Sequence, residues 1–253
     1  MKKTIFLLLF FLSGNLLRCE AKQEKELFNQ ANKLYMDQSY EKAAEAFEKL
    51  IATGKVAPEV YFNLGNAYYK TGNVAASILN YERARRLRPS DPDIAYNLRI
   101  ANLATIDKIE PVPQLFYEKW WDDFVNEGSL NVRAWVVILL FWLSLAVVAI
   151  YLFSGSVFSK KISFFVSILL VLSGAFTCYL TYAQHRHLNN HKAAIIFSMS
   201  AYAKSSPDSK SANLFLLHAG TRIEVLDELQ GWKKVRIANG NEGWIAADAI
   251  EII

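Results

Sequence analysis

The stretch Tyr61-Phe62-Asn63-Leu64-Gly65-Asn66-Ala67-Tyr68-Tyr69-Lys70 decides the fold of the first soluble part of the chain. Its large apolar residues recur at spacings of three and four, which is typical of a helix with one buried face. A second apolar helix pattern follows and ends near Pro89, within a unit of about 34 residues that begins at Pro58. Gly65 predicts a close approach between the two helices. The sequence therefore predicts a packed helical pair over 58–91.

A weaker copy of this pattern lies one unit earlier, over 24–57. Both units resemble the tetratricopeptide repeat (TPR), a helical pair that stacks on its neighbours. A third unit begins at Pro92 and loses the pattern by Asp107, so we interpret it as a closing helix of a repeat region over 22–109. Because about three repeats are usually needed for a stable stack, we expect some outside surface to complete this one.

The resemblance to TPR proteins implies a concave groove that binds a peptide and carries no chemistry of its own. The candidate groove residues come from the first helix of each repeat and are Phe28, Asn32, Tyr35, Phe62, Asn66, Tyr69 and Lys70. Chaperone-binding TPR proteins hold a carboxylate with asparagines and cations, but the cationic places here hold Phe28 and Asp93, which disfavours carboxylate capture. Asn63 and Asn66 are interpreted first as repeat consensus residues and second as a dedicated peptide anchor.

Three apolar stretches interrupt the soluble parts. Residues 1–21 have a basic start and an apolar core, which predicts a secretory signal peptide, with an uncleaved anchor as the alternative. Residues 134–153 and 162–182 are uncharged and long enough to cross about 30 Å of hydrocarbon as helices. The connector with Lys160 and Lys161 favours a transmembrane hairpin whose turn is cytoplasmic. Both soluble parts are therefore expected outside the cytoplasm.

Residues 114–127, just before the first span, predict an amphipathic helix. Aromatic residues occupy one half of it, including Trp120 and Trp121, and charged residues occupy most of the other half. Because tryptophan prefers the membrane–water boundary, we interpret this helix as lying in the interface, with Trp135 at the same boundary. A docking face for the repeats or for a partner is the alternative.

The second span carries small and hydroxyl residues at helical spacing, such as Ser163 and Gly174, which predicts close packing against another helix. The first span is the expected mate, and a second membrane protein is the alternative. His187 and His191 follow this span at a spacing that could share a metal ion. No Asp, Glu or Cys lies near them in sequence, so we expect no metal site there.

Residues 193–253 change to short β-prone runs separated by turn signals, among them Asn239-Gly240, whose residues both favour positive φ in a two-residue hairpin turn. About five strands in so short a segment predict an SH3-like barrel. The runs with the strongest resemblance to the bacterial SH3 family are Leu216–Thr221, Gly231–Arg236 and Asn239–Ile245. Members of that family bind cell-wall or protein ligands. Tyr202, Trp232 and Trp244 are candidate surface aromatics, with the core as an equal alternative for Trp244.

The charge and motif content excludes several functional classes. The net charge of +4 comes from the signal region and from the hairpin turn, so both soluble parts are close to neutral and nucleic-acid binding is not expected. We also expect no enzyme and no cofactor, because the sequence has no nucleophile with a nearby base and no glycine-rich phosphate loop. Cys19 is expected to leave with the signal peptide and Cys178 lies inside the second span, so no disulfide is expected in the soluble parts.

The expected fold class is a mixed multidomain protein with an all-α TPR region, two transmembrane helices and a C-terminal all-β SH3-like barrel. This order resembles the E-component (BatE-like) proteins of the Bacteroides aerotolerance (Bat) operon family over essentially the whole chain. The resemblance implies a bacterial inner-membrane protein with both domains in the periplasm, von Willebrand factor A-type Bat partners, an associated MoxR-type ATPase and a role in aerotolerance or stress tolerance.

Two hypotheses about function remain open from the residues. The first is a scaffold or adaptor, anchored in membrane lipid, whose domains assemble other envelope proteins. The second is an envelope module whose SH3-like barrel binds peptidoglycan while the repeats recruit a partner.

Overall fold

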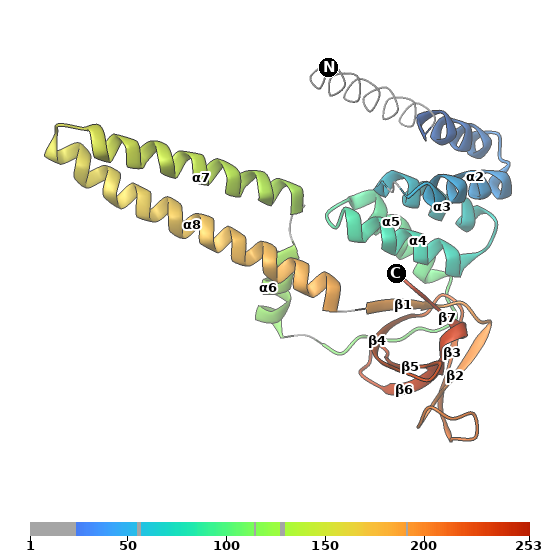
Figure 1. Cartoon of the computed structure of the whole chain (residues 1–253). Coiled ribbons are helices and arrows are strands. Elements are labelled where there is room, and N and C mark those ends of the chain that lie inside the picture. Colours follow the sequence, from blue (N-terminus) through green and yellow to red (C-terminus); the bar gives the residue numbers. More distant parts are fainter. Residues whose placement is uncertain (1–23, 55–56, 114, 127–129, 191) are drawn as a thin grey trace, which may run out of the picture.

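The computed structural model describes residues 24–54, 57–113, 115–126, 130–190 and 192–253. It shows the expected fold class: a helical repeat region, two long apolar helices and a C-terminal antiparallel sheet of seven strands (Figure 1). The expected signal peptide over 1–21 lies outside the described residues.

The repeat region consists of a helix over 24–36 and four further helices. These are α2 (Tyr40–Ala52), α3 (Pro58–Lys70), α4 (Val74–Leu87) and α5 (Pro92–Leu103). Pro58 and Pro92 each open a helix, where a missing N–H costs no hydrogen bond. The side chain of Asn73 caps α4, and that of Asp91 caps α5. The helix starts therefore follow from local sequence signals.

The close approach expected at Gly65 is present. A Cβ atom on this residue would lie 2.6 Å from two ring carbons of Tyr81, which is itself almost completely buried. Only glycine allows α3 and α4 to meet over this ring. The first repeat builds its own core from helix 24–36, α2 and α3, centred on Phe47.

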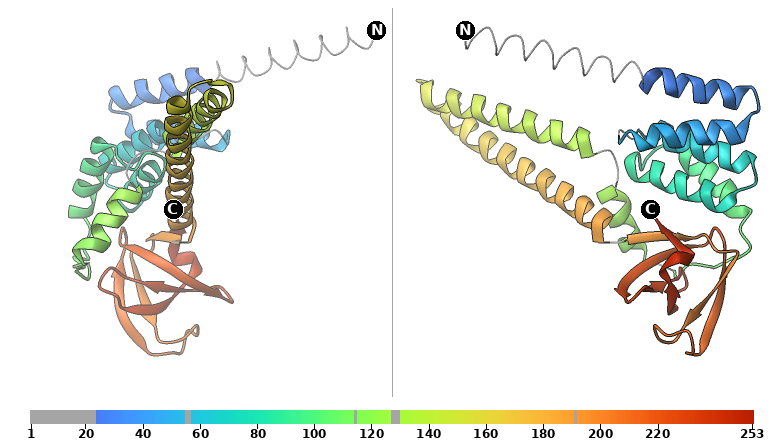
Figure 2. Two further views of the ribbon diagram at one scale, coloured as in Figure 1. Left: turned by 90° about the vertical axis from the view of Figure 1, so that its left-hand side faces the viewer. Right: turned by 45° about the vertical axis from the view of Figure 1, so that its right-hand side comes forward.

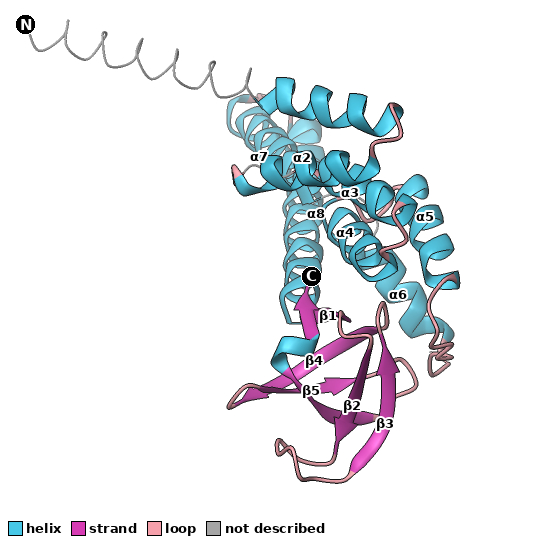
Figure 3. Ribbon diagram, turned by 90° about the vertical axis from the view of Figure 1, so that its right-hand side faces the viewer, coloured by secondary structure: helices cyan, strands magenta, loops and turns pink. Residues whose placement is uncertain are grey.

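The barrel of the same chain is the surface that completes the repeat stack. Ile195 of β1 (Lys192–Ile196) is fully buried in one apolar cluster with Ile78 of α4 and Leu98 of α5. Ala219 and Ile253 of the barrel pack against the same cluster. Figure 3 shows the repeat helices above the barrel, with α4 close to the C-terminus. The last repeat thus seals its core with a β-domain instead of a further helix.

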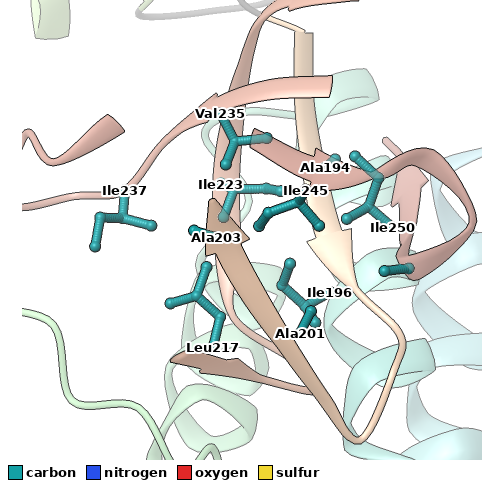
Figure 4. Close-up of a cluster of buried hydrophobic side chains, with 11 residues drawn as sticks. Ala194, Ile196, Ala201, Ala203, Leu217, Ile223, Val235, Ile237, Ile245 and Ile250 are labelled. Atoms are coloured by element: carbon teal, nitrogen blue, oxygen red, sulfur yellow. The ribbon is translucent and has the colours of Figure 1, made fainter. Parts of the chain in front are cut away.

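The barrel is one sheet with the strand order β3-β2-β6-β5-β4-β1-β7. The strands after β1 are β2 (Ser200–Lys204), β3 (Asn213–His218), β4 (Arg222–Leu229), β5 (Trp232–Arg236), β6 (Glu242–Ala246) and β7 (Ile250–Ile252). Isoleucine, valine, leucine and alanine side chains fill its core (Figure 4). Strands β2 and β7 were not among the expected strands. Positive φ was expected at both residues of Asn239-Gly240, whereas only Gly240 of this pair adopts it.

The segment between α5 and α6 (Phe116–Asn126) belongs to the barrel. Ile109 packs against the barrel core, and the Val112 N–H donates a hydrogen bond to the Ala238 carbonyl at 3.1 Å. This segment is therefore more than a linker between the repeats and α6. We call residues 105–113 the strap, because they run over one end of the barrel before α6 begins.

Helices α7 (Leu130–Phe153) and α8 (Val157–Asn190) form an antiparallel hairpin (Figure 1). By length and composition both could cross a membrane, and almost none of their apolar surface is buried inside the protein. A core helix of a soluble protein would be covered, so this exposure indicates membrane association. Ser163 is buried and Thr177 is half-buried, so these positions of α8 face the interior of the hairpin. A Cβ atom on Gly174 would meet no atom within 4 Å, so the close helix approach expected at this glycine is not present.

Candidate binding surfaces

The repeat region contains an open pocket with a volume of about 210 Å³. Its lining combines three tyrosines, two asparagines, one lysine and one isoleucine: Tyr35, Asn66, Tyr69, Lys70, Tyr81, Asn97 and Ile100. Four of these were expected groove residues. The structure thus brings together side chains from helix 24–36, α3, α4 and α5, and we call this site the repeat pocket.

Paired asparagines join the first helices of successive repeats. Asn63 donates to Asn32 at 2.9 Å, and Asn97 donates to Asn66 at 2.8 Å. The Tyr81 hydroxyl also donates to Asn66 Oδ1, at 2.7 Å. Asn66 therefore accepts two hydrogen bonds at Oδ1, and among the described residues no acceptor binds its amide hydrogens, which are left for a ligand. The asparagines therefore have a structural role and, at Asn66, a remaining capacity to donate.

Two expected groove residues pack into cores instead of lining the pocket. Phe28 lies edge-on to Phe47 with ring centroids 6.1 Å apart, and both belong to the first-repeat cluster. Phe62 lies 5.8 Å from the Tyr81 ring and packs against the second-repeat cluster. Asn32, which accepts from Asn63, does not line the pocket either.

The pocket offers mainly hydrogen-bond donors. Burial raises the pKa of Tyr81 to about 12, and burial together with Tyr40 raises the pKa of Tyr35, so both phenols stay neutral at physiological pH. Tyr69 and Lys70 are exposed at the edge of the pocket. A lysine ammonium with phenol and amide donors suits a ligand that presents carbonyl or carboxylate oxygens.

Sequence reasoning missed the contribution of Tyr81 to this pocket. The signal was present, because Tyr81 occupies the place that Phe47 occupies in the first repeat, and only the tyrosine has a hydroxyl. The change from phenylalanine to tyrosine at a buried position indicates a polar partner.

The barrel carries a second candidate surface. Trp244 of β6 lies opposite Lys204 of β2 and Lys234 of β5, and Trp232 lies opposite Ala246. Because directly paired residues and residues two apart share a face, Tyr202, Trp244 and Trp232 all lie on the outer face of β2, β6 and β5. Tyr202 is exposed and both tryptophans are half-buried. We call this surface, with its two lysines, the barrel aromatic face.

A carboxylate in the strap connects the repeats to the barrel. Asp107 accepts hydrogen bonds from the Thr221 hydroxyl at 2.6 Å, from the His218 backbone N–H at 2.7 Å and from His218 Nδ1 at 2.7 Å. Burial alone would raise the pKa of Asp107, but these three hydrogen bonds outweigh it and the pKa is lowered. The Thr221 hydroxyl binds the carboxylate and not the imidazole, so the group acts as a clasp and lacks a nucleophile–base pair.

The arginines near the end of α4 also hold the barrel. Arg83 donates to Glu251 at 3.2 Å and to the Ile252 carbonyl at 2.9 Å, and Arg86 donates to the Ile253 carbonyl at 3.0 Å. Cationic side chains near a helix C-terminus interact favourably with the helix dipole even when they point into solvent. The structure shows a more specific role for two of them, since they fix the last strand of the barrel on α4.

The expected membrane-interface residues lie at one end of the hairpin. Trp120 and Trp121 are exposed on α6, and Trp135 is exposed near the start of α7. The candidate metal ligand His191 and the side chain of His187 fall outside the part of the chain that is described. Within that part, no group of three or more His, Cys, Asp or Glu could hold a metal ion.

Comparison with known families identifies both soluble domains. Residues 28–92 match the tetratricopeptide repeat, and residues 200–251 match the bacterial SH3 domain. The comparison with curated proteins gave no match. The domain content is therefore a TPR region, which indicates protein–protein interaction, and a bacterial SH3 domain, which indicates cell-wall binding and an envelope location. The strap with Asp107 lies outside both matched segments, whereas its partners His218 and Thr221 lie within the bacterial SH3 match.

Proposed function

We propose that the protein is a membrane-anchored scaffold of the cell envelope whose repeat pocket binds a partner protein. The observation that carries this proposal is that the barrel covers Ile78 and Leu98 of the repeats, while the pocket beside Asn66 stays open. Because the stack is completed within the chain, a partner is not needed to seal it. The open pocket is then free for recognition.

The pocket chemistry supports an extended peptide segment as the ligand. Lys70 provides a positive charge, and Asn66 provides amide hydrogens that its Oδ1 partners do not use. Backbone carbonyls or an acidic side chain of the peptide would satisfy these donors. The exposed Tyr69 ring would cover the apolar part of the same segment.

The test is crosslinking in native membranes followed by mass spectrometry, with the full chain carrying Tyr69→Ala and Lys70→Glu. Both residues are exposed, so the variant should fold while recovery of the partner falls by at least tenfold. Tyr96→Ala with Arg99→Glu is the matched control, because this exposed aromatic–cation pair on α5 lies outside the pocket. Equal partner recovery from both variants would place the binding surface elsewhere.

For the cellular setting we propose the bacterial inner membrane, with both domains in the periplasm. The basic turn at Lys160 and Lys161 and the expected signal peptide support this orientation. Alkaline phosphatase fused after Ser159 should be inactive and fused after His191 active. The reverse result would invert the topology.

The resemblance to BatE-like proteins supports a more specific proposal. The partners would be von Willebrand factor A-type Bat proteins in the same membrane, with a MoxR-type ATPase in the same complex, and the process would be aerotolerance or stress tolerance. The crosslinking experiment tests this directly, because it identifies the recovered proteins. We propose a binding role and no enzymatic activity for this chain.

The alternative function is peptidoglycan binding by the barrel aromatic face. Three aromatic side chains on one sheet face would stack on sugar rings. Lys204 donates to the Ser209 and Ser211 carbonyls and Lys234 pairs with Glu242, so the aromatic rings and not these lysines carry the proposed contact. Sedimentation of the detergent-solubilised full chain with purified peptidoglycan tests this function. Tyr202→Ala, at an exposed ring, should strongly reduce co-sedimentation, whereas Leu87→Ala on the repeats should not. Failure of the unmodified chain to sediment would exclude the alternative.

A further inference from the structure

Helix α6 presents an aromatic surface that no other part of the described chain covers. We call it the α6 aromatic face; its exposed members are Phe116, Tyr117, Trp120, Trp121 and Phe124. Phe116 is 85% exposed and Trp120 is 64% exposed, and the Trp120 and Phe124 rings stack on each other. Soluble proteins rarely expose so many large apolar side chains on one short helix, so the face indicates a binding surface.

Arg133 fixes the level of α6 along the hairpin. Its guanidinium donates to the Phe124 carbonyl at 3.2 Å and to the Leu180 carbonyl at 3.4 Å. Phe124 lies near the end of α6, and Leu180 lies near the end of the apolar part of α8. The C-terminal part of α6 is therefore held at the boundary of the two spans, and buried Val125 packs there as well.

Other boundary residues gather at the same level. Trp135 is 71% exposed near the start of α7, and Tyr182 is 62% exposed near the end of α8. Figure 2 (left) shows α6, in green, inclined to the hairpin and beside its lower part, so α6 does not continue the direction of either span. A helix at the level of an aromatic belt and parallel to the membrane surface has the geometry of an interfacial helix.

We propose that the α6 aromatic face is seated in the headgroup region of the same bilayer that the hairpin crosses. The α6 aromatic face lies at the same end of the hairpin as the exposed apolar surface of the spans. A bilayer that covers the spans would therefore also cover this face, which favours lipid over a protein partner as the occupant. Partition of aromatic side chains into the interface is favourable without any specific protein contact. The proposal does not depend on which ligand the repeat pocket or the barrel binds.

The same contact sets the height and tilt of the soluble module. The strap joins α6 to the barrel through Val112 and Ile109, and α8 enters the barrel through β1. The barrel is also fixed to the repeats through Ile195. With both α6 and the hairpin in the membrane, the repeats and the barrel are held at two points and cannot swing freely on α8.

The test is electron paramagnetic resonance of nitroxide labels on the full chain in phospholipid nanodiscs, with Cys19 and Cys178 replaced by Ser. Labels at Phe116→Cys and Trp120→Cys should be more accessible to oxygen than to a polar nickel complex, like a label at Trp135→Cys. The control is Met36→Cys, a residue that is 73% exposed on the repeats, which should show the opposite preference.

Two outcomes would overturn the proposal. Labels on α6 that are as accessible to the nickel complex as the Met36 site would show that the face lies in water. Labels protected from both reagents would show that protein, either a partner or a second copy, covers it. Quenching of tryptophan fluorescence by brominated lipid provides a measurement without cysteines. Replacing Trp120 and Trp121 by Phe should remove the part of the fluorescence that brominated lipid quenches. If only the unquenched part of the fluorescence is lost, the proposal is contradicted.

Discussion

The two repeats have nearly the same pattern but seal their cores in different ways. In the first repeat, Phe47 is buried among residues of the repeats only. In the second repeat, Tyr81 occupies the corresponding place, and its cluster extends to Ile195 of the barrel. Gly65 faces the Tyr81 ring where the first repeat has Ala31. The same helical frame thus packs once against the next helix of the array, since α3 completes the first-repeat core, and once against the barrel.

The difference shows what a short repeat array needs. An internal repeat buries its exposed side against the next repeat, whereas the last repeat must find another cover. Here the barrel supplies that cover, and the arginines of α4 and Asp107 of the strap hold it in place. The polar network around Tyr81 shapes the repeat pocket in the same repeat. The second repeat therefore both packs against the barrel and provides most of the repeat pocket, whereas the first repeat mainly packs against the second.

The sharpest test of this comparison is Ile195→Ala in the full chain. Removing a fully buried isoleucine side chain costs about 2–5 kcal/mol, and here the loss falls on both domains. Hydrogen exchange measured by mass spectrometry should accelerate in α4, α5 and the barrel, with helix 24–36 and α2 unchanged. Leu50→Ala, in the first-repeat core, should give the reverse pattern. Uniform acceleration in both variants would contradict two separate cores.

The clasp at Asp107 predicts that acid loosens the joint before the first repeat. The pKa of Asp107 is lowered in the folded protein. Its ionised carboxylate therefore contributes its full stabilisation of the fold above the ordinary aspartate pKa of about 4, and this contribution is lost as pH falls through the lowered pKa. Exchange in the strap and β3, corrected for the intrinsic rate, should rise below about pH 4. Asp107→Asn should cost about 1.5–3 kcal/mol at neutral pH and remove this dependence.

Asp208→Asn is the control for the acid test, since that carboxylate lies in the β2–β3 loop away from the joint. An unchanged acid profile in Asp107→Asn would assign the pH dependence to other carboxylates.

Gly65→Ala should destabilise the second repeat by about 1–3 kcal/mol, because the added methyl group overlaps the buried Tyr81 ring. Thermal unfolding in detergent, combined with exchange in α3 and α4, measures the effect. Gly174→Ala in α8 is the control, since no atom lies within 4 Å of its added Cβ. If both substitutions are tolerated equally, the helices do not meet at Gly65 as the structure shows.

Tyr81→Phe makes the second repeat resemble the first and should have the smallest effect. Loss of the hydroxyl bond to Asn66 should cost about 1 kcal/mol and loosen the paired asparagines. Exchange should increase at the start of α5 without a change in the barrel, and crosslinking of a partner to the pocket should weaken. A loss of partner recovery with unchanged α5 exchange would mean that the hydroxyl contacts the ligand directly.

Much of this architecture could be predicted from local sequence patterns. Local patterns specify most elements because they act between residues close together in the sequence. These patterns are the repeat period, the prolines Pro58 and Pro92, the two uncharged stretches, and the pairs Gly231-Trp232 and Gly243-Trp244. Strands β2 and β7 were missed because Ser200–Lys204 consists mainly of small or polar residues and β7 has only three residues. Such strands are stabilised by pairing partners that lie elsewhere in the sequence.

The positions of some predicted site residues follow from the same local patterns. Tyr35, Asn66, Tyr69 and Lys70 were placed by their repeat position, which fixes the helix face they occupy. Repeat position did not separate the groove residues from Phe28, because a partly exposed aromatic side chain can turn toward either the groove or the core. That choice depends on the neighbouring helix.

The sequence by itself determined which elements form, because helix periodicity, strand alternation, proline caps and uncharged spans act within a few residues along the chain. Only the tertiary structure decided that the barrel is the cover of the second repeat, that Arg83 reaches Glu251 and that Asp107 binds His218 and Thr221. These contacts join residues more than a hundred positions apart, and their free energy depends on burial and geometry that exist only once both domains have folded.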